Sequence, residues 1–353
     1  MKNIGIFIPT IKPGGAEKQA TLLAILLDKH YHVDLYLNLG MLEPSPENLL
    51  LLNNSGVVLH PLKGTSIQNI FTLSKLLKQN KTDVLFNYMT NCDVIGCIAG
   101  KIAGVPFIYG GIRNAYISYY KLIAERIVHN FLATGSIFNC YSGANEIGGR
   151  GFNKSKNIVI PNCFPDIKEP IIRNDQQVKH IVTIARYVPQ KDYYTAIKSI
   201  EILSKKRKDF VFDAIGYGVE EENIKRWIDE CGVSDFVKLH IRPNNVQEIV
   251  GTSDIYLSTS LFEGTSNSIM EAMNWSLPVV ATKVGDNDIL VRNGESGFLH
   301  PIGDVEGMAV SLNTLIGDIS LRNKMGANGN QILRNQYSIE LFEKRYIDLI
   351  EER

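Results

Sequence analysis

The stretch LFEGTSNSIMEAMNWSLPVVAT, residues 261–282, joins two apolar strands through a polar turn and a helix. The first strand precedes it at 255–258, and the second is the run 279–282. We expect Ser266 or Asn267 to cap the helix, because a short polar side chain accepts hydrogen bonds from first-turn N–H groups. Strand, helix and strand in this succession predict an α/β fold with a parallel sheet.

The turn also has the composition of a ligand site. Glu263 and Glu271 lie eight positions apart, around a segment rich in Gly, Thr, Ser and Asn. The backbone N–H groups at a helix N-terminus attract anions, and carboxylates accept hydrogen bonds from hydroxyl groups. A solvated helix cap has the same composition, so the turn alone leaves both interpretations open.

Strands and helices alternate through the whole chain and predict two lobes. The chain has 353 residues, whereas single cores seldom exceed ~250–300. Prolines at 161, 165 and 170 interrupt the pattern, which is typical of a linker. We expect a first lobe at 1–165, a linker at 166–178, a second lobe at 179–335 and a final helix within 336–353. Two facing, doubly wound sheets of the Rossmann type would form a ligand cleft where the carboxyl ends of their strands meet.

Charge and cysteine content limit the compartment and the partners. Basic and acidic side chains number 37 each, but residues 1–165 carry 15 basic and 9 acidic ones, whereas 166–353 carry 22 and 28. A basic front half suits an anionic acceptor or a negative membrane surface, although chance also produces such asymmetry. The five cysteines form no CxxC pair, and no run of ~18 apolar residues occurs. These features favour a reduced, cytoplasmic protein without a membrane span.

Three further loops at predicted strand ends carry candidates. Gly15 lies in a glycine turn that leads into a helix and lets a ligand approach the backbone. Arg186 and Lys191 lie between a strand and a helix, where two cations can neutralise a diphosphate without a metal ion. Gly216 begins a Gly-Tyr-Gly turn against which a nucleoside could rest. Each loop alone is also compatible with an ordinary turn or surface role.

Taken together, these features resemble the retaining glycosyltransferases of family four, which have the GT-B fold. The resemblance is strong over 180–300. It rests on the five-residue spacing of Arg186 and Lys191, the Gly216 loop, the run 240–287, the segment NGESGFL at 293–299, and the match of the two glutamates to the family's E-x7-E pattern. It is looser in the front half, at 14–17 and 161–162.

The resemblance implies a nucleotide-sugar donor of the UDP or GDP type, held mainly by the second lobe. Arg186 and Lys191 would bind its diphosphate, Glu271 its ribose hydroxyls, and Glu263 the transferred sugar. The remaining donor contacts would come from Gly15, Gly216, Gly264, Thr265, Ser266, Asn267 and Ser268. The acceptor would lie on the first lobe, and the last helix would cross back to that lobe.

One departure from the family changes the expected chemistry. Family members often carry a histidine in the loop after the strand at 107–109, where this chain reads GGIRN. The leaving phosphate oxygen is therefore expected to accept the proton of the acceptor hydroxyl, which gives retention by front-face attack. Arg113 and Asn114 become acceptor-side candidates, with a solvated arginine as the alternative. The Asp286-Asn287-Asp288 sequence lacks a second ligand cluster, so we expect neither a metal nor another cofactor.

We therefore expect a metal-independent hexosyltransferase that transfers a sugar to a glycan or a polyprenyl-linked glycan in cell-surface polysaccharide synthesis. One segment combines aromatic and cationic side chains as interfacial helices do, at Tyr116, Tyr119, Tyr120, Lys121 and Arg126. This combination predicts peripheral contact of the first lobe with the inner face of the membrane. An ordinary packed helix is the alternative there. We expect no nucleic-acid partner, because the cationic run 205–208 is typical of a solvated helix end.

Two other functions remain open at this point. A nucleotide-sugar hydrolase or epimerase of the same fold would need acid–base groups in the front-lobe loops, where such groups are sparse. A non-catalytic two-lobed binding protein would normally be exported, and the sequence shows no signal peptide.

Overall fold

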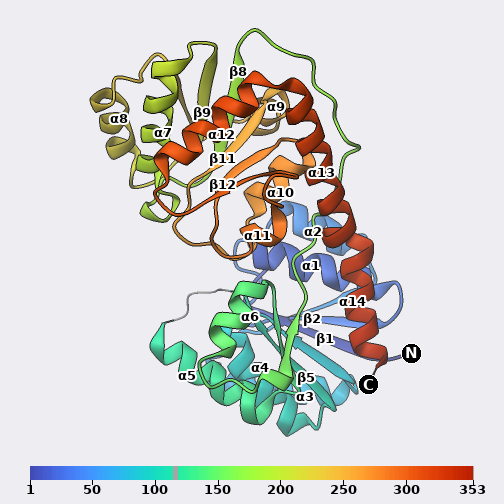
Figure 1. The fold of residues 1–353 in the computed structure, drawn as a ribbon. Helices are drawn as coiled ribbons and strands as arrows, with labels where there is room; N and C mark the ends of the chain where they lie inside the picture. The colour runs from blue at the N-terminus through green and yellow to red at the C-terminus, as the bar shows by residue number, and fades with distance from the viewer. Residues whose placement is uncertain (114–117, 353) are drawn as a thin grey trace. The chain divides into compact units, whose positions relative to one another are not determined.

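The computed structural model describes residues 1–113 and 118–352, which form two compact units. The N-terminal unit combines Met1–Cys163 with Ile339–Arg353, and the C-terminal unit is Phe164–Ser338. Figure 1 shows each unit as a sheet with helices around it. The candidates Asn114 and Tyr116 lie outside the described residues.

A seven-stranded parallel sheet forms the centre of the N-terminal unit, in the order β3-β2-β1-β4-β5-β6-β7. Its strands are β1 (Asn3–Ile8), β2 (His32–Leu37), β3 (Val58–Pro61), β4 (Val84–Asn87), β5 (Phe107–Ile112), β6 (Gly135–Phe138) and β7 (Asn157–Val159). Ile4 and Ile6 of β1 join the core on one face, whereas Phe7 joins the core on the other. Burial on both faces explains why β1 is a continuous apolar run.

Helices cover both faces of this sheet. α1, α2 and α14 pack with the core that contains Ile4, and α3 and α4 pack with the core that contains Phe7. The helical segments are α1 (Gly15–Asp28), α2 (Pro46–Asn53), α3 (Ser66–Gln79), α4 (Thr90–Ala103), α5 (Tyr119–Ile127), the π-helical η1 (Val128–Leu132), α6 (Tyr141–Gly148), the 3₁₀ turn η2 (Lys154–Lys156) and α14 (Ile339–Glu351).

The C-terminal unit repeats this architecture with six parallel strands in the order β10-β9-β8-β11-β12-β13. The strands are β8 (Lys179–Ile184), β9 (Phe210–Gly216), β10 (Val237–Ile241), β11 (Ile255–Ser258), β12 (Val279–Thr282) and β13 (Gly297–His300). The helical segments are the 3₁₀ turn η3 (Pro189–Lys191), α7 (Tyr193–Lys206), α8 (Glu221–Glu230), α9 (Val246–Thr252), α10 (Asn267–Asn274), α11 (Asn287–Leu290), α12 (Val305–Gly317) and α13 (Ile319–Tyr337).

Both sheets confirm the predicted α/β class with doubly wound, Rossmann-type topology. In each unit the strand order reverses once, between β1 and β4 in the first and between β8 and β11 in the second. Ligands of such sheets bind outside the carboxyl ends of the strands, at the point where the order reverses. These two positions are therefore where functional side chains are sought below.

The segment before β8 lies along the C-terminal unit. The backbone N–H of Lys168 donates to Asn274 Oδ1 at 2.7 Å, and Arg173 Nε donates to the carbonyl of Ser253 at 2.7 Å. These bonds attach the proline-containing segment to α10 and to the end of α9. Within residues 1–113 and 118–352, no helix combines the length and hydropathy that a bilayer span requires.

Candidate functional site

Strand ends of the C-terminal sheet bring the predicted donor-binding residues to one edge. Arg186 follows β8, Gly216 ends β9, and Glu263 lies in the loop after β11. Lys191 belongs to η3, and Glu271 to α10. Because β8 lies between β9 and β11 and all three are parallel, their following loops leave the same edge of the sheet.

An ion pair joins two of the predicted residues, Lys191 and Glu263. Lys191 Nζ lies 2.5 Å from Glu263 Oε1, and the two side chains are only 16% and 11% exposed. Ser260 Oγ donates to the same carboxylate oxygen at 2.8 Å. The Thr259 hydroxyl donates to the backbone carbonyl of Lys191 at 2.9 Å, which fixes the turn that carries the lysine. A cation and a hydrogen-bond acceptor are thus held side by side in a partly desolvated place.

The turn that leads into α10 is capped as one of the two predicted alternatives requires. Ser266 is the N-cap, and its Oγ accepts the N–H of Ile269 at 3.5 Å. Ser266 Oγ also lies 3.2 Å from Ser268 Oγ. Asn267 is instead the first residue of the helix, with its side chain exposed.

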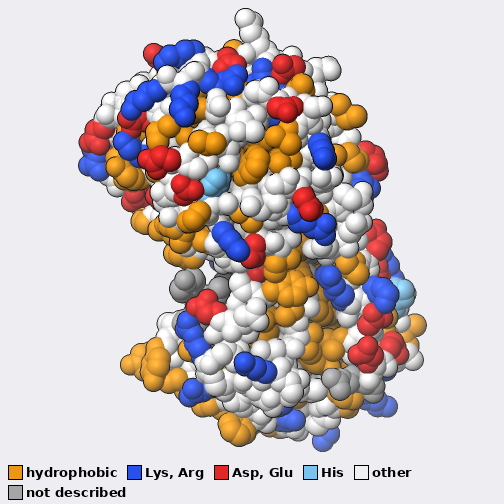
Figure 2. All heavy atoms as spheres, in the orientation of Figure 1, with side chains coloured by type: hydrophobic (Ala, Val, Ile, Leu, Met, Phe, Trp, Pro, Cys, Tyr) orange, Lys and Arg blue, Asp and Glu red, His pale blue; other side chains and the backbone are white. Residues whose placement is uncertain are grey.

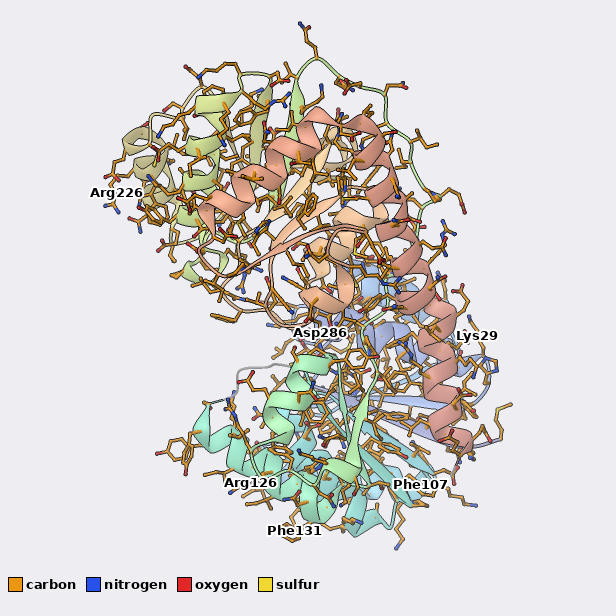
Figure 3. All side chains as sticks on the ribbon, viewed as in Figure 1. Lys29, Phe107, Arg126, Phe131, Arg226 and Asp286 are labelled. Atoms are coloured by element: carbon orange, nitrogen blue, oxygen red, sulfur yellow. The ribbon has the colours of Figure 1, made fainter. Side chains whose placement is uncertain are left out.

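A second loop gives this turn its shape. Gly285 has a φ of +57°, and a Cβ there would lie 2.4 Å from the carbonyl oxygen of Glu263. The next residue, Asp286, donates its N–H to the carbonyl of Gly264 at 3.1 Å and accepts from Thr265 Oγ1 at 3.2 Å. Figure 3 labels Asp286, which lies directly before α11. Asp286 therefore supports the Gly264–Thr265 backbone from behind.

The two glutamates meet around a buried tyrosine of β11. Burial raises the pKa of Tyr256, and the carboxylates of Glu271 and Glu263 raise it further. A hydrogen bond with Ser268 opposes this rise, and Tyr256 Oη donates to the carbonyl of Ile184 at 3.4 Å. Both carboxylates therefore act on the same Tyr256 hydroxyl.

A cavity of about 720 Å³ opens beside this cluster, at the ends of β8, β9 and β10. Its walls include Ile215, Tyr217 and Val246, and two arginines, Arg186 and Arg242, also line it. The guanidinium carbon of Arg242 lies 4.4 Å from the Tyr217 ring centroid, a cation–π contact. The volume is in the ~300–1,000 Å³ range of small-molecule pockets. Apolar walls beside two cations suit a planar base attached to phosphates.

Three of the lining residues escaped the sequence-based prediction. Arg242, Pro243 and Val246 follow β10 and line the cavity. Their position was the available signal, because β10 is parallel to β9 and ends at the same edge of the sheet. Arg242 also has a φ of +48°, a value uncommon for a non-glycine residue, and the sequence alone does not reveal it.

Two glycines of the β9 turn are explained by their contacts with protein backbone. A Cβ on Gly216 would lie 2.0 Å from the carbonyl oxygen of Ala185, and one on Gly218 would lie 2.3 Å from that of Tyr187. Any larger residue would therefore push the β8 loop away from the β9 turn. Gly216 lines the cavity, and its contact with a ligand stays a prediction.

The acceptor-side and front-loop candidates lie in the N-terminal unit. Gly15 is the first residue of α1 and is exposed. Arg113 directly follows β5, with its guanidinium carbon 4.0 Å from the Tyr88 ring centroid. Its Nη1 donates to Asn162 Oδ1 at 3.4 Å, and its Nη2 donates to Tyr346 Oη at 3.3 Å. The solvated-arginine alternative is therefore wrong: Arg113 is packed against aromatic side chains.

Metal-ligating side chains do not converge in the described part of the chain. No group of three or more His, Cys, Asp or Glu residues is close enough there to hold an ion. Asp288 instead pairs with Lys283 at 3.7 Å. Metal independence of the reaction stays a prediction, to be tested with a chelator.

Comparison with known proteins identifies the family. Residues 166–332 match the family model described as Glycosyl transferases group 1. An uncharacterised glycosyltransferase of Haemophilus influenzae is 30% identical over 358 residues, covering 96% of this chain and 97% of that protein. The Escherichia coli UDP-Gal:alpha-D-GlcNAc-diphosphoundecaprenol alpha-1,3-galactosyltransferase is 24% identical over 310 residues, with 80% of each chain covered.

Solved structures give the same fold. The crystal structure of the Anabaena protein HepE in complex with UDP matches with a TM-score of 0.83 at 19% identity, and the match covers 100% of both chains. This likeness confirms the predicted GT-B fold. Given the near full-length likeness to the Haemophilus protein and the family match over the unit that holds the glutamate pair, the chain belongs to the group 1 glycosyl transferases.

Proposed function

We propose that this glycosyltransferase takes a hexose from a UDP-sugar and transfers it, with retention of anomeric configuration, to a hydroxyl of a polyprenyl-linked glycan. The observation that carries the proposal is the cluster of Arg186, Lys191, Glu263 and Glu271 beside a base-sized cavity. The printed names of two similar proteins support the choice of UDP, since one uses UDP-Gal and the other was solved with UDP. Synthesis of a cell-surface polysaccharide is the process that such an acceptor implies.

In this proposal the donor is divided among separate parts of the site. The uracil ring lies in the cavity against Tyr217, and Glu271 accepts hydrogen bonds from the ribose hydroxyls. Arg186 and Lys191 bind the diphosphate. Lys191 would exchange part of its contact with Glu263 for a phosphate oxygen, which leaves Glu263 to accept from a hydroxyl of the transferred sugar. The N–H groups and hydroxyls of the turn 264–268 complete the contacts, together with Gly216 and, in the N-terminal unit, Gly15.

The same residues supply the chemistry of departure. As the anomeric C–O bond breaks, negative charge grows on the nucleoside diphosphate, and fixed cations stabilise that charge more in the transition state than in the ground state. The acceptor hydroxyl then attacks from the face that the diphosphate leaves, and its proton passes to the departing phosphate oxygen. With two cations already at the diphosphate, the charge can be stabilised without a divalent ion.

Nucleotide binding tests the donor assignment. Glu271→Ala should weaken UDP binding by about tenfold or more in calorimetry, because a charged acceptor of ribose hydroxyls is worth about 1.5–3 kcal/mol. The matched control is Glu222→Ala, an 85% exposed glutamate on α8, which removes the same charge and should leave binding unchanged. Equal affinity of both variants would reject the ribose assignment, and tighter binding of GDP than UDP would reject the choice of base.

Peripheral contact with the membrane is the second part of the proposal. Tyr119 and Tyr120 at the start of α5 are 71% and 84% exposed, and Figure 2 shows hydrophobic side chains gathered at this end of the N-terminal unit. Lys121 and Arg126 lie on the same helix. Aromatic rings beside cations suit the interface of an anionic bilayer.

Vesicle sedimentation checks this contact. The protein should bind phosphatidylglycerol vesicles more than phosphatidylcholine vesicles, and added salt should weaken the binding by screening. Replacing Tyr119 and Tyr120 with Ser should reduce the bound fraction, whereas Tyr194→Ser, a 47% exposed tyrosine of the C-terminal unit, should not. Binding that depends neither on lipid charge nor on the two tyrosines would exclude this surface as the membrane contact.

A further inference from the structure

A second cavity lies in the N-terminal unit, at the point where its strand order reverses. It has a volume of about 280 Å³ and is lined by Pro9 after β1, Met89 after β4, and Gly111–Arg113 at the end of β5. Residues from the first turn of α4 and from α5 complete the wall, among them Glu125. The sheet topology makes this position a binding site in many proteins of this architecture.

One lining residue, Glu125, belongs to a pair of buried carboxyl groups that sequence analysis did not single out. Its partner, Asp93, is buried but does not line the cavity. Glu125 and Asp93 are 1% and 0% exposed, and neither forms an ion pair with a described lysine, arginine or histidine. Asp93 Oδ1 accepts the N–H of Gly111 at 2.8 Å, but Asp93 Oδ2 and Glu125 Oε1 have no N–H or O–H partner among the described residues. Burial raises the pKa of both groups, and for Asp93 the neighbouring Glu125 raises it further.

One shared proton accounts for this arrangement. Two buried carboxylates cannot both ionise side by side, so Asp93 and Glu125 share one proton across their hydrogen bond. The pair therefore keeps one negative charge, and Glu125 is its member at the wall of the cavity. A buried carboxylate without a cation costs several kcal/mol unless it is hydrogen-bonded. Asp93 and Thr90 hydrogen-bond with Glu125, but its Oε1 is a buried acceptor without a donor among the described residues.

The opposite wall of the cavity carries hydrogen-bond donors that lack acceptors. Arg113 Nε has no hydrogen-bond partner among the described residues, and both of its Nη bonds are long, at 3.3 and 3.4 Å. Lys121 lines the cavity and makes no ion pair with a described residue. The first turn of α4 has no side-chain cap, and its residues Thr90 and Asn91 line the cavity. The cavity therefore offers donors on one side and a carboxylate acceptor on the other.

We propose that this cavity binds the terminal sugar of the acceptor, and that Glu125, held by Asp93, accepts a hydrogen bond from one of its hydroxyl groups. A sugar ring both donates and accepts hydrogen bonds, which matches the two walls, whereas a phosphate would meet the charge of Glu125. The volume is just below the ~300–1,000 Å³ of drug-sized pockets, a size for one ring rather than an oligosaccharide. The identity of this sugar as the acceptor rests on the proposed function, whereas the presence of a sugar-binding site does not.

The test separates acceptor binding from donor binding. The probes are p-nitrophenyl glycosides of hexoses and N-acetylhexosamines, with binding measured by saturation-transfer NMR and transfer from UDP-sugars measured as kcat and KM. Hydrolysis of UDP-sugar without acceptor reports on the donor site. Glu125→Gln should raise the glycoside KM at least tenfold with unchanged donor hydrolysis. Asp93 is a positioning residue, and Asp93→Asn should give the same pattern as Glu125→Gln.

Controls keep each outcome decisive. Glu146→Gln on α6, whose side chain is 41% exposed, should behave as the unmodified protein. If Glu125→Gln fails to fold, Lys121→Met, at an exposed residue of the same wall, should still raise the glycoside KM several-fold. The proposal is overturned if no glycoside binds, or if glycoside KM is unchanged in the folded variants. It is also overturned if donor hydrolysis falls in parallel with transfer. Absence of UDP binding to the unmodified protein would instead count against the proposed function.

Discussion

At the scale of single residues, the donor site depends on two cations whose settings differ. Lys191 is largely buried and paired with Glu263, whereas Arg186 is exposed and forms no ion pair with a described residue. Lys191 is therefore already oriented, and Arg186 must be ordered by the diphosphate that it binds. Side-chain ordering of this kind costs about 0.5–1.5 kcal/mol, so we expect Lys191 to contribute more to turnover than Arg186.

Replacing both cations tests this role. The Arg186→Ala, Lys191→Ala double variant should lose about 10²- to 10³-fold or more in kcat, because preorganised charge at a leaving group is worth that much per donor. The control is the Lys205→Ala, Lys206→Ala pair at the end of α7, which removes the same charge from a helix surface. A double variant with near-normal turnover would exclude both residues from the reaction.

Chelation tests the absence of a metal at the same scale. Transfer should survive EDTA, because Asp286 is engaged with Thr265 and the backbone of Gly264 and Asp288 is paired with Lys283. Initial rates with and without chelator are the measurement. Activity that disappears with EDTA and returns with Mn²⁺ would assign a role to these two aspartates.

Sequence reasoning reached the donor side of the site because its residues lie close together along the chain or at recognisable strand ends. Glu263 and Glu271 flank one turn, and Lys191 follows Arg186 by five residues. Asp93 and Glu125 are different, because they lie 32 residues apart on two helices and meet only when α4 packs against α5. A helical carboxylate is usually solvated, and nothing in the local sequence marks these two as buried.

At the scale of elements, a polar contact connects three neighbouring strands of the C-terminal sheet. Asp213 of β9 is 3% exposed. It accepts from His180 Nδ1 of β8 and from His240 Nε2 of β10, each at 2.7 Å. The hydrogen bond with Asp213 raises the pKa of His180. Burial would raise the pKa of Asp213, but its bonds to the two histidines outweigh burial and lower it.

The pH dependence of stability follows from these two directions. The raised pKa of His180 stabilises the fold fully below its ordinary value of about 6.5, and this contribution is lost as the pH rises through the folded value. The lowered pKa of Asp213 stabilises the fold above about pH 3.8. This contribution is lost as the pH falls through the folded value. Asp213→Asn should therefore destabilise most between about pH 4 and 6.5.

Urea unfolding at pH 5.5 and pH 8 measures this contrast. The loss at pH 5.5 should be about 1–2 kcal/mol, since the imidazoles are partly exposed and the charge is screened, and the loss at pH 8 should be smaller. Asp235→Asn, at an exposed position just before β10, serves as the control. A loss that is equal at both pH values would show that the contact does not depend on histidine charge.

The elements that sequence patterning missed share a physical reason. The apolar strands β11 and β12 have the bounds that the sequence pattern predicted, 255–258 and 279–282. The three residues of β7 are all half-buried, so that strand has no continuous apolar run. α2 contains four consecutive leucines, which hide its helical period. Short or uniformly apolar segments carry too little periodicity to be assigned without their neighbours.

At the scale of the whole molecule, the last helix belongs to the core of the first unit. Phe342 of α14 is 1% exposed and lies in the cluster that contains β1 and α1. Its ring centroid is 5.0 Å from that of Tyr346, whose hydroxyl accepts from Arg113. The end of the chain therefore both fills the core and supports an acceptor-side candidate.

Truncation of this side chain measures the contribution of α14. Phe342→Ala should cost about 3–5 kcal/mol of unfolding free energy, because it leaves a cavity in a packed core, and urea titration gives the value. Phe131→Ala removes the same ring from an exposed place in the N-terminal unit, labelled in Figure 3 and 77% exposed, and should cost under about 1 kcal/mol. Similar losses in the two variants would mean that α14 contributes little to the first unit.

This interleaved arrangement has a consequence for biosynthesis. Domains generally fold in the order in which the ribosome releases them, but here the segment that completes the first core is translated only after the whole C-terminal unit. The nascent front half must wait, with the apolar surface around Leu23 and Leu27 uncovered, while the inserted half is made and folds. Premature termination just before residue 339 would thus release a chain with a folded C-terminal unit and an N-terminal unit whose core is exposed. Such a chain is a natural substrate for chaperones and proteases.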